Sequence, residues 1–153
     1  QKMKKIFITI LFISISLIRF SNLNLEAQNN YDDYTQLKIL TNIQVIRVYD
    51  GDTFFCNIPY LHWLIGSNIS VRIRGIDTAE IRGGTIETKR QAQESKEALI
   101  KLFENRKITL YNLNRDKYFR ILADVKADDI DVKEYMIKNN FAKKYDGGKK
   151  EEW

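Results

Sequence analysis

Cysteine and histidine are almost missing from this chain of 153 residues, which holds one of each, Cys56 and His62. A single cysteine excludes an internal disulfide and a zinc site built on several cysteines. A Ser/His/Asp triad would depend on His62 alone, and a histidine beside Trp63 in an apolar stretch is more often a packed or partly exposed side chain. Chemistry in this chain is therefore expected to use carboxylates, arginines and lysines.

The composition sets the size of the fold but says little about its partner. The chain is 44% hydrophobic and 29% charged, which is ordinary for one globular domain, and it is too short for two large cores. The formal charge is +5, but the first 27 residues hold four of the basic residues and one of the acidic ones, so the remainder carries +2. Residues 71–126 hold 13 basic and 8 acidic residues, an excess that suggests an anionic partner but also fits a solvated surface.

The N-terminal segment has the organisation of a secretory signal peptide. Three lysines within the first five residues precede an apolar run over residues 6–18, which Arg19 closes. The run is short for a membrane span, which needs about 20 mostly apolar residues. We expect residues 1–27 to be a signal peptide, cleaved after Ala27, and the protein to be secreted or periplasmic. The alternative is an uncleaved anchor that holds the protein at a membrane, outside the cytoplasm.

The rest of the chain is predicted to be a short linker followed by one folded domain. Residues 28–42 are mostly polar and are expected to form a flexible linker, and the domain is expected to occupy residues 43–153. Segments rich in Ile, Val, Phe and Tyr, separated by turn residues, predict strands at residues 43–49, 53–58, 69–76, 107–113 and 119–125.

Helical spacing of apolar residues predicts two helices. The first spans residues 88–104, with Thr88 and Gln91 as a capping box, and the second spans residues 131–139. Five strands with a helix after the third match the order of an OB-type barrel, a mainly β fold of the α+β class that often binds nucleic acids or sugars. We expect Trp63, in the apolar loop at residues 59–67, to pack onto the barrel, and the tail at residues 145–153 to be a surface extension.

Acidic residues follow two of the predicted strands. The Asp50-Gly51-Asp52-Thr53 segment joins the first two strands and, taken alone, is typical of a hairpin turn. Asp77, Thr78 and Glu80 follow the third strand, so their oxygen atoms can converge where Asp52 also arrives. Oxygen ligands without histidine or cysteine favour Ca²⁺ or Mg²⁺ over zinc.

Arginines accompany these acidic residues. Arg72 and Arg74 lie on one face of the third strand by alternation, while Asp77 has the other parity. One site can include both Arg72 and Asp77 only if the strand bends between them, and Gly75 is where a bulge forms most easily. The simpler interpretation of paired arginines is a solvated face with salt bridges. Arg120, near the start of the fifth strand, follows the basic and aromatic segment Lys117-Tyr118, which is suited to binding a phosphate.

With these motifs in this order, the chain resembles the staphylococcal nuclease (thermonuclease) family over about residues 43–145. The resemblance rests on Asp-Gly-Asp-Thr at residues 50–53, on Arg72 followed five residues later by Asp-Thr-x-Glu, and on Asp-Lys-Tyr-x-Arg at residues 116–120. It implies a calcium-dependent endonuclease that hydrolyses phosphodiester bonds of DNA and RNA and leaves 3′-phosphate ends.

The resemblance also implies roles for individual residues. Asp52, Asp77 and the carbonyl of Thr78 would bind Ca²⁺, and Glu80 would orient or deprotonate the attacking water. These roles agree with elementary chemistry, because a water beside a bound dication loses its proton more readily to a carboxylate within hydrogen-bond reach.

Four further residues would contact the nucleic acid if the resemblance holds. Arg72 and Arg120 would neutralise the transition state and help the 5′-oxygen leave, a task that suits the bidentate guanidinium. Lys117 and Tyr118 would hold an adjacent phosphate.

The chain departs from the family at two positions, and an alternative function stays open. Ala79 stands where the family usually has proline, and Phe119 where it usually has glycine. The alternative is a non-catalytic OB-fold module that binds nucleic acid or a protein partner, although such modules generally lose the acidic or arginine residues that this chain keeps. We expect a monomer.

Overall fold

The computed structural model describes residues 19, 39–82, 84–148 and 153. Apart from Arg19, the predicted signal peptide lies outside the described residues, and so does the predicted linker up to residue 38. The chain divides into two units, residues 1–37 and residues 38–153, and every element below belongs to the second.

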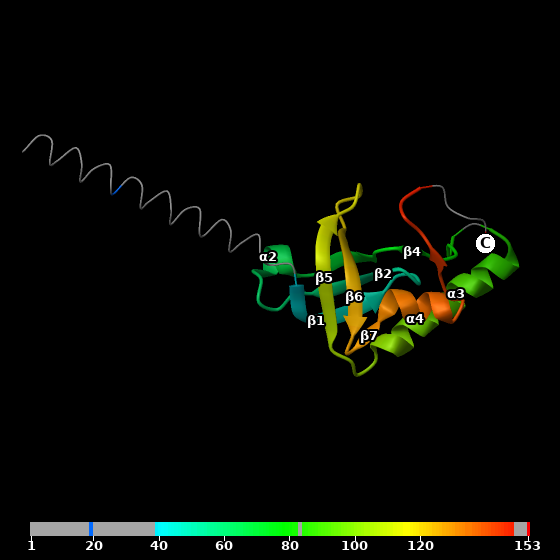
Figure 1. Cartoon of the computed structure of the whole chain (residues 1–153), viewed down its shortest axis with the longest axis horizontal. Coiled ribbons are helices and arrows are strands. Elements are labelled where there is room, and N and C mark those ends of the chain that lie inside the picture. The colour runs from blue at the N-terminus through cyan, green and yellow to red at the C-terminus, as the bar shows by residue number, and fades with distance from the viewer. Residues whose placement is uncertain (1–18, 20–38, 83, 149–152) are drawn as a thin grey trace, which may run out of the picture. The chain divides into compact units, whose positions relative to one another are not determined.

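Five strands form a closed barrel in the second unit (Figure 1). They are β1 (Ile39–Val48), β2 (Thr53–Asn57), β3 (Ile69–Ile73), β5 (Ile108–Arg115) and β6 (Ile121–Ala127). Antiparallel pairs join β3 to β2, β2 to β1, β1 to β5 and β5 to β6, and a parallel pair of β3 with β6 closes the barrel. The predicted mainly β, OB-type barrel of the α+β class is confirmed.

Shorter elements and two longer helices complete the domain. They are α2 (Trp63–Gly66), β4 (Ile76–Asp77), α3 (Ile86–Phe103), β7 (Ile130–Asp131), α4 (Val132–Lys138) and β8 (Lys143–Lys144). β4 pairs with β8, so the segment that follows α4 returns to the end of the third barrel strand. Among the described residues, no helix is both long enough and apolar enough to cross a membrane.

The first and third predicted strands have different ends in the structure. β1 begins at Ile39, because Leu40 is buried and pairs with Leu110 of β5, so residues 39–42 of the predicted linker belong to the barrel. The third strand is interrupted after Ile73, because Gly75 adopts a φ of 82°, and β4 resumes after it. The bend expected at Gly75 is therefore confirmed.

The fifth predicted strand starts two residues too early. Phe119 has a φ of 68°, a left-handed backbone conformation that a strand does not allow, and β6 begins only at Ile121. Arg120 therefore lies in the turn that precedes the strand, and not within it.

Both predicted helices are present, and one cap was assigned to the wrong residue. α3 is capped by Thr85, whose hydroxyl accepts the backbone N–H of Thr88, so the cap lies three residues before the predicted Thr88. α4 has the expected cap, in which the Asp131 carboxylate accepts the backbone N–H of Glu134 at 3.0 Å.

The loop at residues 59–67 differs from its prediction in two ways. It contains the single helical turn α2, capped by His62, whose Nδ1 accepts the backbone N–H of Leu64 at 3.3 Å. Trp63 is 71% exposed, so the expectation that it packs onto the barrel is wrong.

The core fills the barrel and the space beneath α3 and α4. Phe54 of β2 is fully buried and meets Phe103 of α3 edge to face, with ring centroids 5.0 Å apart. Phe55 points to the opposite face, where the guanidinium carbon of Arg47 lies 3.6 Å from the centre of the Phe55 ring. The two faces of β2 therefore have different surroundings, the core on one side and Arg47 on the other.

We predict that replacing each of these adjacent phenylalanines by alanine has very different effects. Phe54→Ala should lower the free energy of unfolding by about 3–5 kcal/mol, because it leaves a cavity in the core. Phe55→Ala should cost about 1 kcal/mol, because the ring is only half buried. Urea unfolding followed by circular dichroism measures both, and equal losses would contradict the assignment of the two faces.

Candidate functional site

The turn between β1 and β2 is built for close packing. A Cβ atom on Gly51 would lie 2.6 Å from Cβ of Ser95 in α3 and 2.7 Å from Cγ2 of Thr78, so only glycine fits between them. The Asp50 carboxylate accepts the backbone N–H of Asp52 at 3.2 Å and fixes the turn. The Asp-Gly-Asp segment is therefore more than a simple hairpin turn, because it presses against two other parts of the chain.

Asp52 is the most heavily bonded carboxylate of the site, although it is only 2% exposed. Its Oδ2 accepts the backbone N–H of Thr78 at 3.2 Å and the Thr78 hydroxyl at 3.3 Å. Its Oδ1 accepts the Thr53 hydroxyl at 2.8 Å and forms an ion pair with Nη1 of Arg72. These bonds offset much of the cost of burying the carboxylate.

Arg72 lies between Asp52 and Asp77. Its Nη2 pairs with Oδ1 of Asp77 at 3.2 Å and donates to the backbone carbonyl of Ile76 at 3.0 Å. The bend at Gly75 brings these two groups back toward the strand that carries Arg72. Arg74 has different partners. Its Nη2 donates to the carbonyl of Leu122 at 3.2 Å, and these contacts involve neither Asp52 nor Asp77.

Burial disfavours the charged forms of two residues in this cluster, Asp50 and Arg72. Burial raises the pKa of Asp50 from its ordinary value, against the opposing effects of Arg72 and of the bonds from Thr53. Burial also lowers the pKa of Arg72, while Asp77 and Asp50 act to raise it. Asp50 and Arg72 therefore each favour the ionised form of the other.

Arg120 reaches the same cluster from the turn before β6. The Asp116 carboxylate holds it, accepting its Nε–H at 2.7 Å and its backbone N–H at 3.0 Å. Its Nη1 lies 3.4 Å from the Thr53 hydroxyl, which in turn bonds to Asp52. Two arginines from segments far apart in the sequence thus converge on Asp52.

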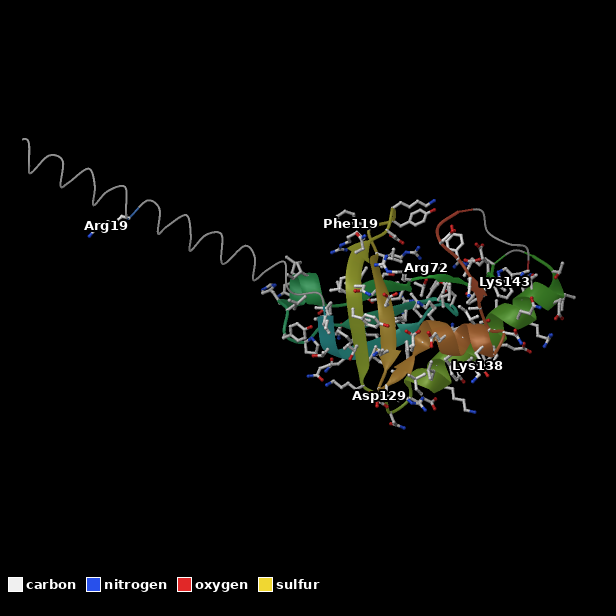
Figure 2. All side chains as sticks on the ribbon, viewed as in Figure 1. Arg19, Arg72, Phe119, Asp129, Lys138 and Lys143 are labelled. Carbon is white, nitrogen blue, oxygen red and sulfur yellow. The ribbon has the colours of Figure 1, made fainter. Side chains whose placement is uncertain are left out.

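A groove of about 2050 Å³ opens above these residues. Figure 2 shows Arg72 between the hairpin turn that carries Phe119 and the segment that carries Lys143. The groove is lined by seven of the eight predicted site residues, namely Asp52, Arg72, Thr78, Glu80, Lys117, Tyr118 and Arg120. Of the described residues that line it, ten are basic and six are acidic, so the groove favours an anionic ligand.

Asp77, the remaining predicted site residue, is buried and 4% exposed. Its Oδ2 accepts the indole N–H of Trp153 at 3.5 Å, and the ammonium of Lys143 lies 4.8 Å from the centre of that indole ring. In the tail that was expected to be a surface extension, Asp146, Gly147 and Gly148 are exposed, but Trp153 is half-buried and bonds to Asp77 of β4. The sequence carries no signal for this contact, because no spacing pattern connects residue 153 to β4.

Sequence analysis also missed three supporting residues, Asp50, Thr53 and Asp116. Each lies within a motif that was recognised, and each bonds to a predicted site residue. Their position within the motifs was the signal that could have identified them.

The residues present are chemically suited to a hard cation. Asp52, Asp77 and the Thr78 carbonyl offer oxygen ligands only. Formally, the four carboxylates of Asp50, Asp52, Asp77 and Asp116 exceed the two guanidiniums by two charges, which a dication would offset. Among the described residues no three of His, Cys, Asp and Glu gather into a metal-binding group, so the remaining ligands would have to be waters or substrate.

Comparisons with known proteins identify the family. Residues 70–152 match the model of the staphylococcal nuclease homologue family, and the chain belongs to this family. It is similar to the probable staphylococcal-like nuclease CAN1 of Oryza sativa subsp. japonica, at 29% identity over 82 residues, covering 54% of this chain and 23% of that protein. It is also similar to the probable staphylococcal-like nuclease CAN3 of the same organism, at 30% identity over 72 residues, covering 47% and 18%. The chain therefore spans about a fifth of the length of these relatives.

We predict that Arg72 of β3 stabilises the fold far more than Arg74, which follows the end of that strand. Arg72→Met should lower the free energy of unfolding by about 3–5 kcal/mol, because two buried carboxylates lose their partner. The control Arg74→Met should cost about 1 kcal/mol, because that side chain is more exposed. Thermal unfolding measures both, and equal costs would show that the Asp52–Arg72–Asp77 cluster does not stabilise the site.

Proposed function

We propose that this protein is a calcium-dependent endonuclease that hydrolyses phosphodiester bonds of DNA and RNA and leaves 3′-phosphate ends. The observation that carries the proposal is the convergence of Arg72 and Arg120 on Asp52, in a groove where basic residues outnumber acidic ones. Membership of the family and the printed names of the relatives support nuclease chemistry in general.

The cation we propose is Ca²⁺, held by Asp52, Asp77 and the carbonyl of Thr78. Bound there, it would lower the pKa of a water molecule and offset negative charge at the phosphate. The contribution of the chain is to hold two carboxylates ready in a buried place. The bonds from Thr53 and Thr78 keep Asp52 in position, and Trp153 does the same for Asp77.

The roles of the remaining residues follow from their place along the groove. Glu80 is exposed and lines the groove, so it can accept a proton from the water whose oxygen attacks phosphorus. Arg72 and Arg120 would donate to the phosphate oxygens as negative charge develops and the bond to the 5′-oxygen breaks. Lys117 and Tyr118, both exposed at the rim, would hold a neighbouring phosphate.

The location and assembly of the protein are part of the same proposal. The order of lysines and apolar residues at the N-terminus supports export, to a secreted or periplasmic location or to the outer side of a membrane that the segment anchors. We propose that the enzyme acts as a monomer, because the residues of the proposed site all come from one chain.

The first test is cleavage by the purified chain. We expect degradation of single-stranded DNA, double-stranded DNA and RNA in the presence of Ca²⁺, and no degradation after EDTA is added, because the carboxylates then lack their cation. Gel electrophoresis measures this, and labelling of the products by polynucleotide kinase without phosphatase treatment detects the 5′-hydroxyl ends that accompany 3′-phosphates. Tight binding without turnover in any divalent ion would instead favour the non-catalytic OB-fold module.

The second test separates the chemistry from the fold. Glu80→Gln should lose the proton acceptor and Arg120→Ala the charge that stabilises the transition state, so each should lower kcat by about 10²- to 10³-fold. The matched controls Glu94→Gln and Arg90→Ala change exposed residues of α3 that do not line the groove, and they should retain the rate of the wild type. Initial rates on a fluorescent oligonucleotide measure all four, and wild-type rates in both site variants would remove their proposed roles.

A further inference from the structure

The stretch of chain from residue 54 to residue 71 contains no charged residue, in a protein that is 29% charged. At its centre, three consecutive large apolar side chains are exposed: Trp63 by 71%, Leu64 by 70% and Ile65 by 62%. Tyr60, just before them, is 51% exposed. We call the side chains of Tyr60, Trp63, Leu64 and Ile65 the apolar tip. A contiguous apolar group of this kind usually marks a binding surface.

The apolar tip is held in place by a hydrogen-bonded loop. The backbone N–H of Ile58 donates to the carbonyl of Gly66 at 2.7 Å, and that of Ser67 donates to the carbonyl of Trp63 at 3.1 Å. Gly66 is required, because a Cβ atom there would lie 2.8 Å from Cβ of Leu61. The loop is therefore folded tightly and still presents its largest apolar side chains to solvent, instead of burying them.

The apolar tip lies at the end of the barrel away from the groove. In the pairing of β2 with β3, Thr53 is opposite Arg72 at the groove, and Cys56 is opposite Ile69 at the other end, next to the loop. Figure 1 shows α2 at one end of the barrel, with α3, α4 and β4 toward the other. A partner at the apolar tip would therefore leave the groove open.

The chain enters the barrel at the same end. β1 begins at Ile39, and the Tyr60 side chain hydrogen-bonds with the backbone of Thr41. The 38 residues before β1 include three lysines followed by the apolar run at residues 6–18. This part of the sequence has the charge and apolar order of a segment that enters a membrane. β1, which follows it in the chain, begins at the end of the barrel that carries the apolar tip.

We propose that the apolar tip inserts into the surface of a lipid bilayer. Tyrosine and tryptophan favour the interface between acyl chains and headgroups, while leucine and isoleucine favour the acyl chains. The absence of charge from the loop suits a neutral apolar phase and not a basic or acidic partner. A second protein is a poorer fit, because specific protein interfaces bury about 800 Å² on each side and involve about 20–30 residues. The insertion would turn the groove toward the aqueous phase.

The first experiment measures the surroundings of Trp63 in the full chain. The chain has two tryptophans, and Trp153 contacts Asp77 at the groove, so the Trp63→Phe variant reports Trp153 alone. Neutral phosphatidylcholine vesicles minimise binding through basic residues. We expect vesicles to shift the wild-type emission to shorter wavelength and brominated acyl chains to quench it, and we expect neither effect in Trp63→Phe.

The second experiment changes the apolar tip without removing its tryptophan. The double variant Leu64→Asp with Ile65→Asp should weaken insertion of the tip on the order of 100-fold, so that brominated lipids no longer quench Trp63. The control Ile86→Asp changes another apolar residue, 90% exposed on α3, and should be quenched like the wild type. Thermal unfolding checks that the variants remain folded, as expected for exposed positions.

Three results would overturn the proposal. The first is co-sedimentation of the wild-type chain with vesicles while Trp63 emission stays unchanged, which would mean that another segment makes the contact. The second is the absence of any association with vesicles. The third is a self-associated chain whose Trp63 emission is already shifted before vesicles are added, which would assign the apolar tip to a second copy. None of these outcomes depends on nuclease activity, so the experiments test membrane insertion independently of the proposed function.

Discussion

The guanidinium of Arg72, paired with the buried carboxylates of Asp52 and Asp77, is the interaction on which the site depends. Buried charges persist only when they are paired and hydrogen-bonded, and here one arginine serves two acids from different elements. The turn before β2, the middle of β3 and the short β4 must therefore keep their relative positions. The rest of the local structure, from the glycine-only turn to the bend at Gly75, can be understood as a consequence of this requirement.

Segments far apart in the sequence contribute to the groove in different ways. The turn before β6 supplies Arg120, which Asp116 orients, and Trp153 covers the carboxylate of Asp77 from the other side. A single hydroxyl, that of Thr53, connects the second arginine to the acidic pair. Polar networks of this kind fix geometry more than they add stability, because each group left without its partner would be costly in a buried place.

Much of this arrangement is predictable from the sequence, because spacing along a strand determines which side chains can meet. The parity of Arg72 and Asp77 required a bend, and Gly75 was the residue able to provide it; the structure has that bend. The barrel order followed from alternating segments and one helix between them. Family motifs named the remaining residues of the groove, and their catalytic roles stay predictions.

Other features depend on contacts that no local pattern encodes. Thr85 and Thr88 are both good caps, and the apolar pattern of α3, whose buried residues begin at Ala92, does not decide between them. The contact of Trp153 with Asp77 joins residues from the tail and from β4, so no spacing rule predicts it. The exposed Trp63 is opposite to the usual behaviour of tryptophan, because burial is the general tendency and a binding surface is the exception.

The parallel pairing of β3 with β6 has a consequence for how the protein acquires activity. These strands are separated in sequence by α3 and β5, so their pairing is a non-local contact whose loop-closure entropy slows folding. Arg72 and Arg120 stand at this seam and can meet only after it has formed. A nascent or partly folded chain would therefore lack the paired arginines of the proposed site, which assemble only when the barrel closes.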